Sequence, residues 1–454
     1  MNKKKGTHVS LDVNNSNKLR SASMATRSCI TTGESFPDGA MIELVSGPSR
    51  PNQPDLLLWS KGKATVAPRV AHNGNTYEAP LLDPILYRAV RLPAGISDYG
   101  AARKLFVAIT ELFKRHLNAE EREANLLASF SVSTWLCDRL PTAPALLVSG
   151  PDDQMGIVVL CLLSCVCRRP LMLAEVTPAD MRSLPLQLTP TLLLNQPRFT
   201  LNLLRIFHAS SYRGLLLPGK RGTVLDLCGP KAIFCGSDPL DHSLTAGMIQ
   251  VALPPSQSLP SGLDEQVQGD IAGHFQPRLL RYRLKNLAKV RTIDVAFEFS
   301  LPTRQLASAL AMCFPEDSNL AKEIIQLLRS QDEEGREQRF LNVNYAIVEI
   351  LLGLVHNPEQ DEIRVDQLAK DVNVLLRSRG EILEYSAEEI GWKLRSMNIP
   401  RHTTSGGREV PLGRETSQLI HRLAQAYGLP CLASVEPGCP ECSRRQQAVS
   451  KDVM

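Results

Sequence analysis

The sequence lacks any apolar stretch long enough to cross a bilayer. Its most apolar segment, residues 157–167, is interrupted only by Ser164 and falls well short of the roughly 18 residues that a membrane span needs. No apolar segment follows the basic opening "MNKKKG", as one would in a secretory signal. We therefore expect a soluble protein of the cytoplasm, with no membrane partner and with its 11 cysteines reduced.

A broad positive field is missing as well. The formal net charge is +4 over 454 residues. Residues 1–28 hold six basic side chains and one acidic side chain, a net of +5, so the rest of the chain carries −1. Any surface that binds nucleic acid must therefore be local.

Common catalytic motifs are also absent. The sequence contains neither H-E-x-x-H nor G-x-S-x-G, and its nine histidines are dispersed. No residue is therefore assigned a catalytic role, and we expect a protein that is not an enzyme.

What is present is a succession of segments with different patterns. Strand-like apolar runs alternate with helical ones between residues 141 and 255, which is typical of an α/β fold with a parallel sheet. The segments we expect are a disordered basic tail (1–35), a small β-rich unit (36–90), a helical adaptor (91–140), the α/β core (141–255), a helical lid (263–340), a winged-helix domain (341–430) and a flexible tail that contains cysteines (431–454).

The winged-helix prediction rests on three helical segments followed by a hairpin. The third helix begins with a capping box formed by Ser386 and Glu389. The hairpin segment "IPRHTTSGGREVPL" turns at residues 405–407. Three helices followed by a basic hairpin are typical of the winged-helix variant of helix-turn-helix.

A possible phosphate loop follows a strand-like run, in the stretch "SGPDDQMGIVVL". A working loop has the form G-x-x-x-x-G-K-[ST], whose lysine reaches the phosphates and whose hydroxyl holds magnesium. Counted from Gly150, the second glycine position is Met155, the lysine position is Gly156 and the hydroxyl position is Ile157. No lysine or arginine occurs in residues 140–167, so a shifted reading does not restore the motif.

The acidic pair that holds magnesium in such proteins is replaced by amides. The strand "TPTLLLNQP" carries Asn195 and Gln196 at that place, and an amide has no charge with which to bind the metal or accept a proton. The loop amides could still attract an anion, but Asp152 and Asp153 would repel it. We expect no cofactor. Two alternatives stay open: nucleotide binding without turnover, or a plain turn that never held phosphate.

Several segments together resemble the helicase-type AAA+ ATPases that are associated with primases of phages and mobile elements. The likeness spans about residues 92–445 and rests on "LVSGPDDQMG", "RRPLMLAEVTPADM", "TPTLLLNQP", "YRGLLLPGKRGTVLDLCGPKAIF" and "LLRYRLKN". It implies a degenerate P-loop AAA+-like core. It also implies an arginine before the last strand, where this chain has Gly247, and a strand-gripping hairpin that would carry Lys220 and Arg221; the alternative for this segment is an ordinary charged turn.

A second candidate for nucleic-acid contact lies near the carboxyl end. Residues 391–408 contain Lys393, Arg395, Arg401 and Arg408 and no acidic residue. In a winged helix this region meets DNA phosphates. The alternative is the solvated face of a protein-interaction module.

The last cysteines form at most half of a zinc site. Cys439 and Cys442 make a C-x-x-C pair, Cys431 is a third thiol, and His421 is the nearby fourth ligand. We expect reduced thiols in a flexible tail and no metal.

These observations predict a pseudo-ATPase: a non-catalytic nucleic-acid-binding or scaffolding protein derived from a replication ATPase, with DNA, a protein partner or a second copy of itself as partner. The alternatives are a DNA-dependent ATPase that uses non-standard motifs and a protein-interaction module without DNA binding.

Overall fold

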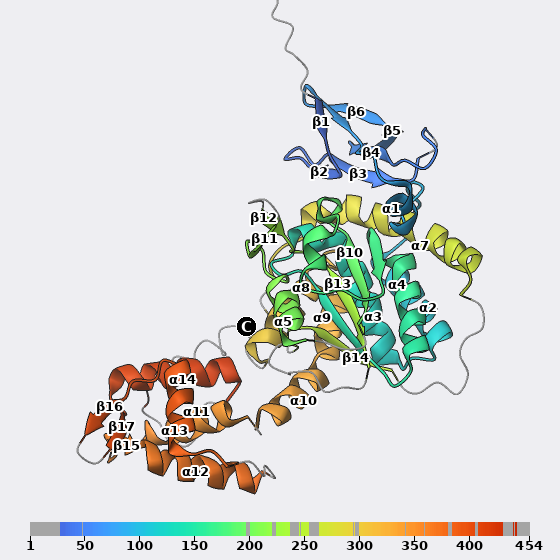
Figure 1. Cartoon of the computed structure of the whole chain (residues 1–454). Helices are drawn as coiled ribbons and strands as arrows, with labels where there is room; N and C mark the ends of the chain where they lie inside the picture. Colours follow the sequence, from blue (N-terminus) through green and yellow to red (C-terminus); the bar gives the residue numbers. More distant parts are fainter. Residues whose placement is uncertain are drawn as a thin grey trace, which may run out of the picture.

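The computed structural model contains a β-rich unit, a central α/β body and a carboxyl-terminal helical unit, drawn in blue, in teal through green and yellow to light orange, and in orange to red (Figure 1). The structure describes residues 28–47, 49–196, 200–219, 224–236, 245, 247–253, 263–293, 295, 299–340, 342–357, 359–379, 384–404, 407–429, 439, 441 and 442. Among these residues, no helix has the length and apolar character needed to span a membrane.

The amino-terminal unit consists of two small sheets. One has the strand order β2-β3-β4-β5 and is antiparallel, and the other has the order β1-β7-β6. The strands are β1 (Ser28–Ile30), β2 (Gly33–Ser35), β3 (Met41–Val45), β4 (Asp55–Ser60), β5 (Lys63–Ala67), β6 (Arg69–His72) and β7 (Asn75–Glu78). Residues 28–35, which we expected to belong to the disordered tail, thus form β1 and β2. Pairing with β7 and β3 gives these two strands backbone hydrogen bonds. The amino-acid composition of residues 1–35 taken as a whole does not indicate such pairing.

A two-residue turn fixes one hairpin of this unit. Asn73 and Gly74 join β6 to β7 with φ angles of 50° and 77°. Positive φ at both central positions is the type I′ geometry, which matches the twist of the strands and favours Asn-Gly.

The central body is built on a five-stranded sheet in which every pair is parallel, with the strand order β14-β8-β13-β10-β9. Its strands are β8 (Ala145–Ser149), β9 (Pro170–Leu173), β10 (Thr191–Asn195), β13 (Lys231–Cys235) and β14 (Ile249–Ala252). This mixed α/β arrangement is consistent with a P-loop-like fold. Since β13 lies between β8 and β10, the carboxyl ends of these three strands meet at one edge, where open α/β sheets bind their ligands.

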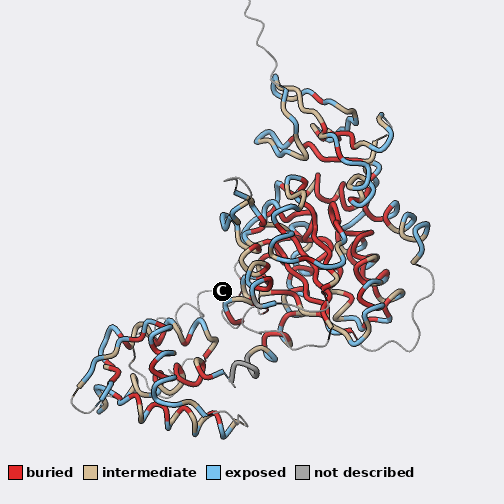
Figure 2. The backbone as a smooth tube through the Cα atoms, in the orientation of Figure 1, coloured by how far each residue is buried: buried red, intermediate tan, exposed pale blue. Residues whose placement is uncertain are grey.

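Both faces of the sheet are covered. Leu146 and Val148 of β8 belong to the larger hydrophobic cluster, whereas Ala145 and Leu147 belong to the cluster on the other face, as strand alternation requires. Buried residues, red in Figure 2, fill this body. Its helices are α1 (Pro84–Ala89), α2 (Ala102–Leu117), α3 (Glu121–Leu136), α4 (Asp153–Val166), α5 (Leu201–Ala209), α7 (Glu265–Asn286), α8 (Leu301–Ala311), α9 (Ser318–Leu327) and α10 (Arg329–Phe340), with short 3-10 turns at Cys137–Arg139, Asp180–Ser183, Leu186–Leu188 and Leu287–Lys289.

A group of five charged side chains, four of them buried, joins the amino-terminal unit to the body. Glu43 of β3 is 3% exposed and accepts hydrogen bonds from Arg168 at 2.9 and 3.0 Å, from Arg169 at 2.7 Å and from Arg283 of α7 at 2.6 Å. Asp138 also pairs with Arg283 and Arg168. Burial alone would raise the pKa of Glu43, but the three arginines outweigh it and lower the pKa to about 2.

The carboxyl-terminal unit has a hydrophobic core of its own. All members of its cluster lie between residues 343 and 429. The elements are α11 (Val343–Leu354), β15 (Glu362–Arg364), α12 (Val365–Ser378), α13 (Ala387–Ser396), β16 (His402–Thr404), β17 (Gly407–Pro411) and α14 (Arg414–Tyr427). The three strands form an antiparallel sheet in the order β15-β17-β16. The expected capping box at the start of α13 is confirmed, with Ser386 and Glu389 capping each other's backbone amides.

Candidate functional site

The predicted phosphate loop lies between the end of β8 and the start of α4, at the ligand-binding edge of the parallel sheet. Gly150 follows β8 directly. Asp152 is the N-cap of α4, and its carboxylate accepts a hydrogen bond from the backbone N–H of Gln154 at 2.9 Å. Asp153 is exposed in the first turn. Two carboxylates thus occupy the helix start, where a phosphate would otherwise find the free amides.

The position that corresponds to the phosphate-binding lysine is closed by an aromatic ring. A Cβ atom added to Gly156 would lie 2.3 Å from Cδ1 of Phe234, on β13. Phe234 is fully buried in the larger cluster, so the ring has little room to move away. No side chain can occupy position 156 unless this ring shifts. By contrast, a Cβ atom at Gly150 would meet the carbonyl oxygen of Leu253 at 3.4 Å, which is an ordinary contact.

The two amide side chains at the carboxyl end of β10 lie at the same edge. Asn195 is in register with Phe234, which is in register with Val148 of β8. The side chain of Gln196 is 3% exposed, and its Oε1 accepts from the backbone N–H of Val176 at 3.0 Å. Gln196 therefore holds the segment after β9, while Asn195 Oδ1 is buried without a hydrogen-bond partner among the described residues. The edge carries neutral amides at the places expected for the acidic pair.

The family resemblance pointed to two further places in the chain, the segment with Lys220 and Arg221 and the position of Gly247. Lys220 and Arg221 lie outside the described residues. The strands on either side of them, β11 (Leu216–Pro218) and β12 (Val224–Asp226), pair antiparallel. Gly247 lies just before β14, and a Cβ atom added to it would meet no described atom within 4 Å.

Three arginines of the carboxyl-terminal unit lie close together around α13. Arg401 Nη1 donates to the carbonyl oxygen of Gly391 at 2.5 Å. A Cβ atom on Gly391 would lie 3.3 Å from Nη1 of Arg401 and 3.9 Å from Nη1 of Arg408. Burial, followed by the charges of Arg408 and Arg395, lowers the pKa of Arg401. The guanidinium groups therefore repel one another, and an anion at this surface would relieve the repulsion.

The fourth predicted residue, Lys393, has a different neighbour. It lies one turn after Glu389 on α13 and lowers the pKa of that carboxyl, after the larger effect of hydrogen bonds from Ser386. Within the described part of the chain, none of the four basic residues forms an ion pair. The structure thus brings Arg395, Arg401 and Arg408 together and leaves Lys393 beside an acid.

Trp392 is a candidate contact residue that sequence reasoning missed. It is 62% exposed, whereas Trp59 and Trp135 are 8% and 1% exposed. The signal was present in the sequence: the buried stripe of α13 contains Ile390 and Leu394, and a residue two positions after Ile390 lies off that stripe. An exposed indole next to basic side chains is suited to stack on bases or guanidinium groups.

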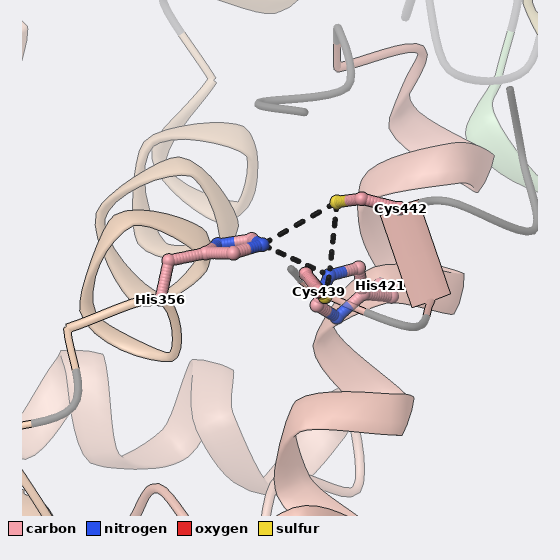
Figure 3. A group of neighbouring side chains, drawn as sticks. All are labelled: His356, His421, Cys439 and Cys442. Carbon is pink, nitrogen blue, oxygen red and sulfur yellow. Dashed lines mark hydrogen bonds between the residues drawn. The ribbon is translucent and has the colours of Figure 1, made fainter. Parts of the chain in front are cut away.

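The predicted cysteine pair lies beside two histidines (Figure 3). Cys439 and Cys442 contact His421 of α14, and Cys442 also contacts His356, which follows α11. Cys431 lies outside the described residues. The sequence reasoning did not name His356, because it precedes the cysteines by more than 80 residues.

No protein-family model and no curated protein sequence matches the chain. Among solved structures, the chain is similar to the C-terminal region of NrS-1 (9% identity, 82% of this chain and 97% of that chain covered, TM-score 0.32). It is also similar to an MCM homolog from Methanopyrus kandleri (12%, 64% and 71%, TM-score 0.34) and to Cdc6p from Pyrobaculum aerophilum (12%, 66% and 93%, TM-score 0.21). Each is a distant likeness, and none assigns a role to a residue of this chain.

Proposed function

We propose that this protein binds nucleic acid through its carboxyl-terminal unit and that its central body is a degenerate P-loop AAA+-like core without catalytic activity. The protein would act as a non-catalytic binding or scaffolding component, a pseudo-ATPase. By its resemblance in sequence to primase-associated ATPases, we take its proposed partners to be DNA and replication proteins in the cytoplasm, or further copies of itself.

The order of elements supports a winged-helix domain. Helix α11, strand β15, helices α12 and α13 and the hairpin β16-β17 follow one another, and β15 pairs with the hairpin. In such domains the third helix and the hairpin contact DNA. Here α13 and β17 carry Arg395 and Arg408.

The single observation that carries the proposal is the arginine cluster of Arg395, Arg401 and Arg408. Like charges are brought together at a surface where no described acidic residue pairs with them. Maintaining this arrangement costs free energy in the free protein, and contact with phosphates would recover it.

The pseudo-ATPase part is supported by the blocked loop. Phe234 fills the space beside Gly156, Asp152 caps the helix, and amides stand in the place of the acids. A working phosphoryl-transfer site needs positive charge and a metal at these places.

The test is DNA binding by the full-length protein, measured by fluorescence anisotropy with a labelled duplex at about 50 and 200 mM salt. Contacts from the three arginines predict a binding constant about fortyfold weaker at the higher salt. Replacing both Arg395 and Arg408 by glutamine should weaken binding and reduce the salt slope by about two. If Trp392 lies at the interface, bound DNA should also quench its fluorescence selectively, since the other two tryptophans are buried.

The matched control is the double variant Lys104→Ala and Lys322→Ala, which removes two exposed positive charges from α2 and α9. It should bind DNA as the wild type does. An equal loss in the control, or no salt-sensitive binding at all, contradicts the proposal, and the latter result would favour a protein-interaction module. ATP turnover stimulated by DNA in the same samples would favour the non-standard ATPase instead.

A further inference from the structure

Four side chains with metal-binding atoms converge at the end of the carboxyl-terminal unit. They are His356 after α11, His421 of α14, and Cys439 and Cys442. Their ligating atoms all lie within 4.8 Å of one another. Figure 3 shows the two imidazole rings and Cys442 directed toward a common centre. His421 and Cys442 are buried, at 4% and 1% exposed.

Four of the six spacings between these atoms match the edges of a coordination tetrahedron, and the other two lie within 4.8 Å. Bonds of roughly 2.0–2.1 Å from zinc to nitrogen and 2.3 Å to sulfur require about 3.4 Å between two nitrogens and about 3.5 Å between nitrogen and sulfur. In the structure the Nε2 atoms of His356 and His421 are 3.3 Å apart. Cys442 Sγ lies 3.3 and 3.4 Å from these nitrogens, and Cys439 Sγ lies 3.4 Å from that of His421.

Backbone carbonyls orient both rings. Nδ1 of His356 lies 2.6 Å from the carbonyl oxygen of Leu352, and Nδ1 of His421 lies 2.7 Å from that of Ser417. A carbonyl can only accept, so each neutral ring carries its hydrogen on Nδ1 and presents the Nε2 lone pair to the centre. Histidines that bind a metal through Nε2 make the same hydrogen bond from Nδ1.

A cation explains why these groups can lie so close. Two Nε2 lone pairs and two sulfur atoms meet here, with the nitrogens 3.3 Å apart and the sulfurs 3.3–3.4 Å from them, and a cation at the centre would turn these facing lone pairs into ligands. The geometry points to a structural zinc site with the ligands His356, His421, Cys439 and Cys442. Two thiolates and two imidazoles are a donor set that zinc prefers, and four protein ligands leave no position for a substrate.

The ion would tie the segment after α14 to the end of α11. The sequence analysis found at most half of a zinc site and expected no metal; His356 completes a set of four ligands with His421, Cys439 and Cys442. This assignment is independent of the proposed DNA-binding role.

The test is the metal content of the full-length protein, purified without chelators and measured by mass spectrometry. About one zinc ion per chain is expected for the wild type, and at least a tenfold lower content for Cys442→Ser and for His356→Ala. Cobalt added to the metal-free protein should give the visible absorption of a tetrahedral thiolate site. Cys442→Ser should abolish that absorption, whereas Cys442→His, which keeps a ligand, should retain metal.

The controls are Cys431→Ser and Cys228→Ser, both of which should keep the wild-type zinc content. Circular dichroism of Cys442→Ser separates loss of the ion from loss of the fold, and the Cys442→His variant tests the site even if the serine variant is unstable. Wild-type protein without zinc that also fails to bind cobalt, a metal content unchanged in His356→Ala, or a Cys439–Cys442 disulfide in the protein as purified would each overturn the assignment.

Discussion

Glu43 shows how one residue can link distant parts of the chain. Its carboxylate is buried and accepts hydrogen bonds from three arginines, and Asp138 supplies a second negative charge. Removing one partner of such a group leaves buried charges uncompensated, which costs about 3–5 kcal/mol. Glu43 therefore stabilises the contact between the amino-terminal unit and the body only while it is ionised.

The pKa of Glu43 makes this stabilisation depend on pH. A carboxyl whose pKa falls from an ordinary value of 4.5 to about 2 on folding contributes about 3 kcal/mol above pH 4.5, and this is lost as the pH falls toward 2. We expect urea unfolding, followed by tryptophan fluorescence, to show lower stability at pH 3 than at pH 7. Glu43→Gln should be destabilised at pH 7, and its deficit relative to the wild type should shrink on acidification. A deficit that is the same at both pH values would contradict this account.

The charge group could not have been predicted from the sequence. Glu43 lies in a short apolar strand, and its partner Arg283 is 240 residues away. Sequence pattern reports local periodicity, whereas this contact depends on how the amino-terminal unit packs on the body. The same holds for the zinc ligands. The C-x-x-C pair is visible in the sequence, whereas His356 is brought beside it only by the fold.

At the scale of elements, the pattern of β8, α4, β9 and β10 was readable. Apolar strand-like runs bounded by turn residues predicted the parallel sheet, and local turn chemistry predicted the capping box of α13 and the β16-β17 hairpin. The order of the strands within the sheet could not be predicted from the sequence. Phe234 is placed beside Gly156 only because β13 lies between β8 and β10.

The contact between β13 and α4 gives a stability prediction. Gly156→Ala should destabilise the protein by about 1–3 kcal/mol, because the new methyl group overlaps the ring of Phe234. Gly150→Ala is the matched control in the same loop and should change stability by less than about 0.5 kcal/mol.

Urea unfolding also tests whether the ring of Phe234 causes this loss of stability. In a Phe234→Leu background the effect of Gly156→Ala should be smaller, since the ring is gone. Equal costs in the two backgrounds, or a Gly156→Ala protein as stable as the wild type, would show that the ring does not set the requirement for glycine.

For the whole molecule, the proposed closure of the phosphate loop predicts that nucleotide does not change the stability of the protein. A ligand present at a hundred times its Kd stabilises a protein by about 2.7 kcal/mol, which is visible as a rise in Tm. We expect about 1 mM ATP with magnesium to leave the Tm unchanged, since Asp152 and Phe234 occupy the places that phosphate and lysine would need. Differential scanning fluorimetry with and without nucleotide checks this. A rise in Tm with ATP would mean that the edge still binds nucleotide.

The placement of Glu43 and Arg283 also has a consequence for biosynthesis. The ribosome makes Glu43 first and Arg283 240 residues later, a delay of roughly 12 to 48 s at 5–20 residues per second. During that interval the Glu43 carboxylate lacks its last hydrogen-bond donor, Arg283. The amino-terminal sheets, which leave the ribosome first, therefore complete their contact with the body only after α7 has been made.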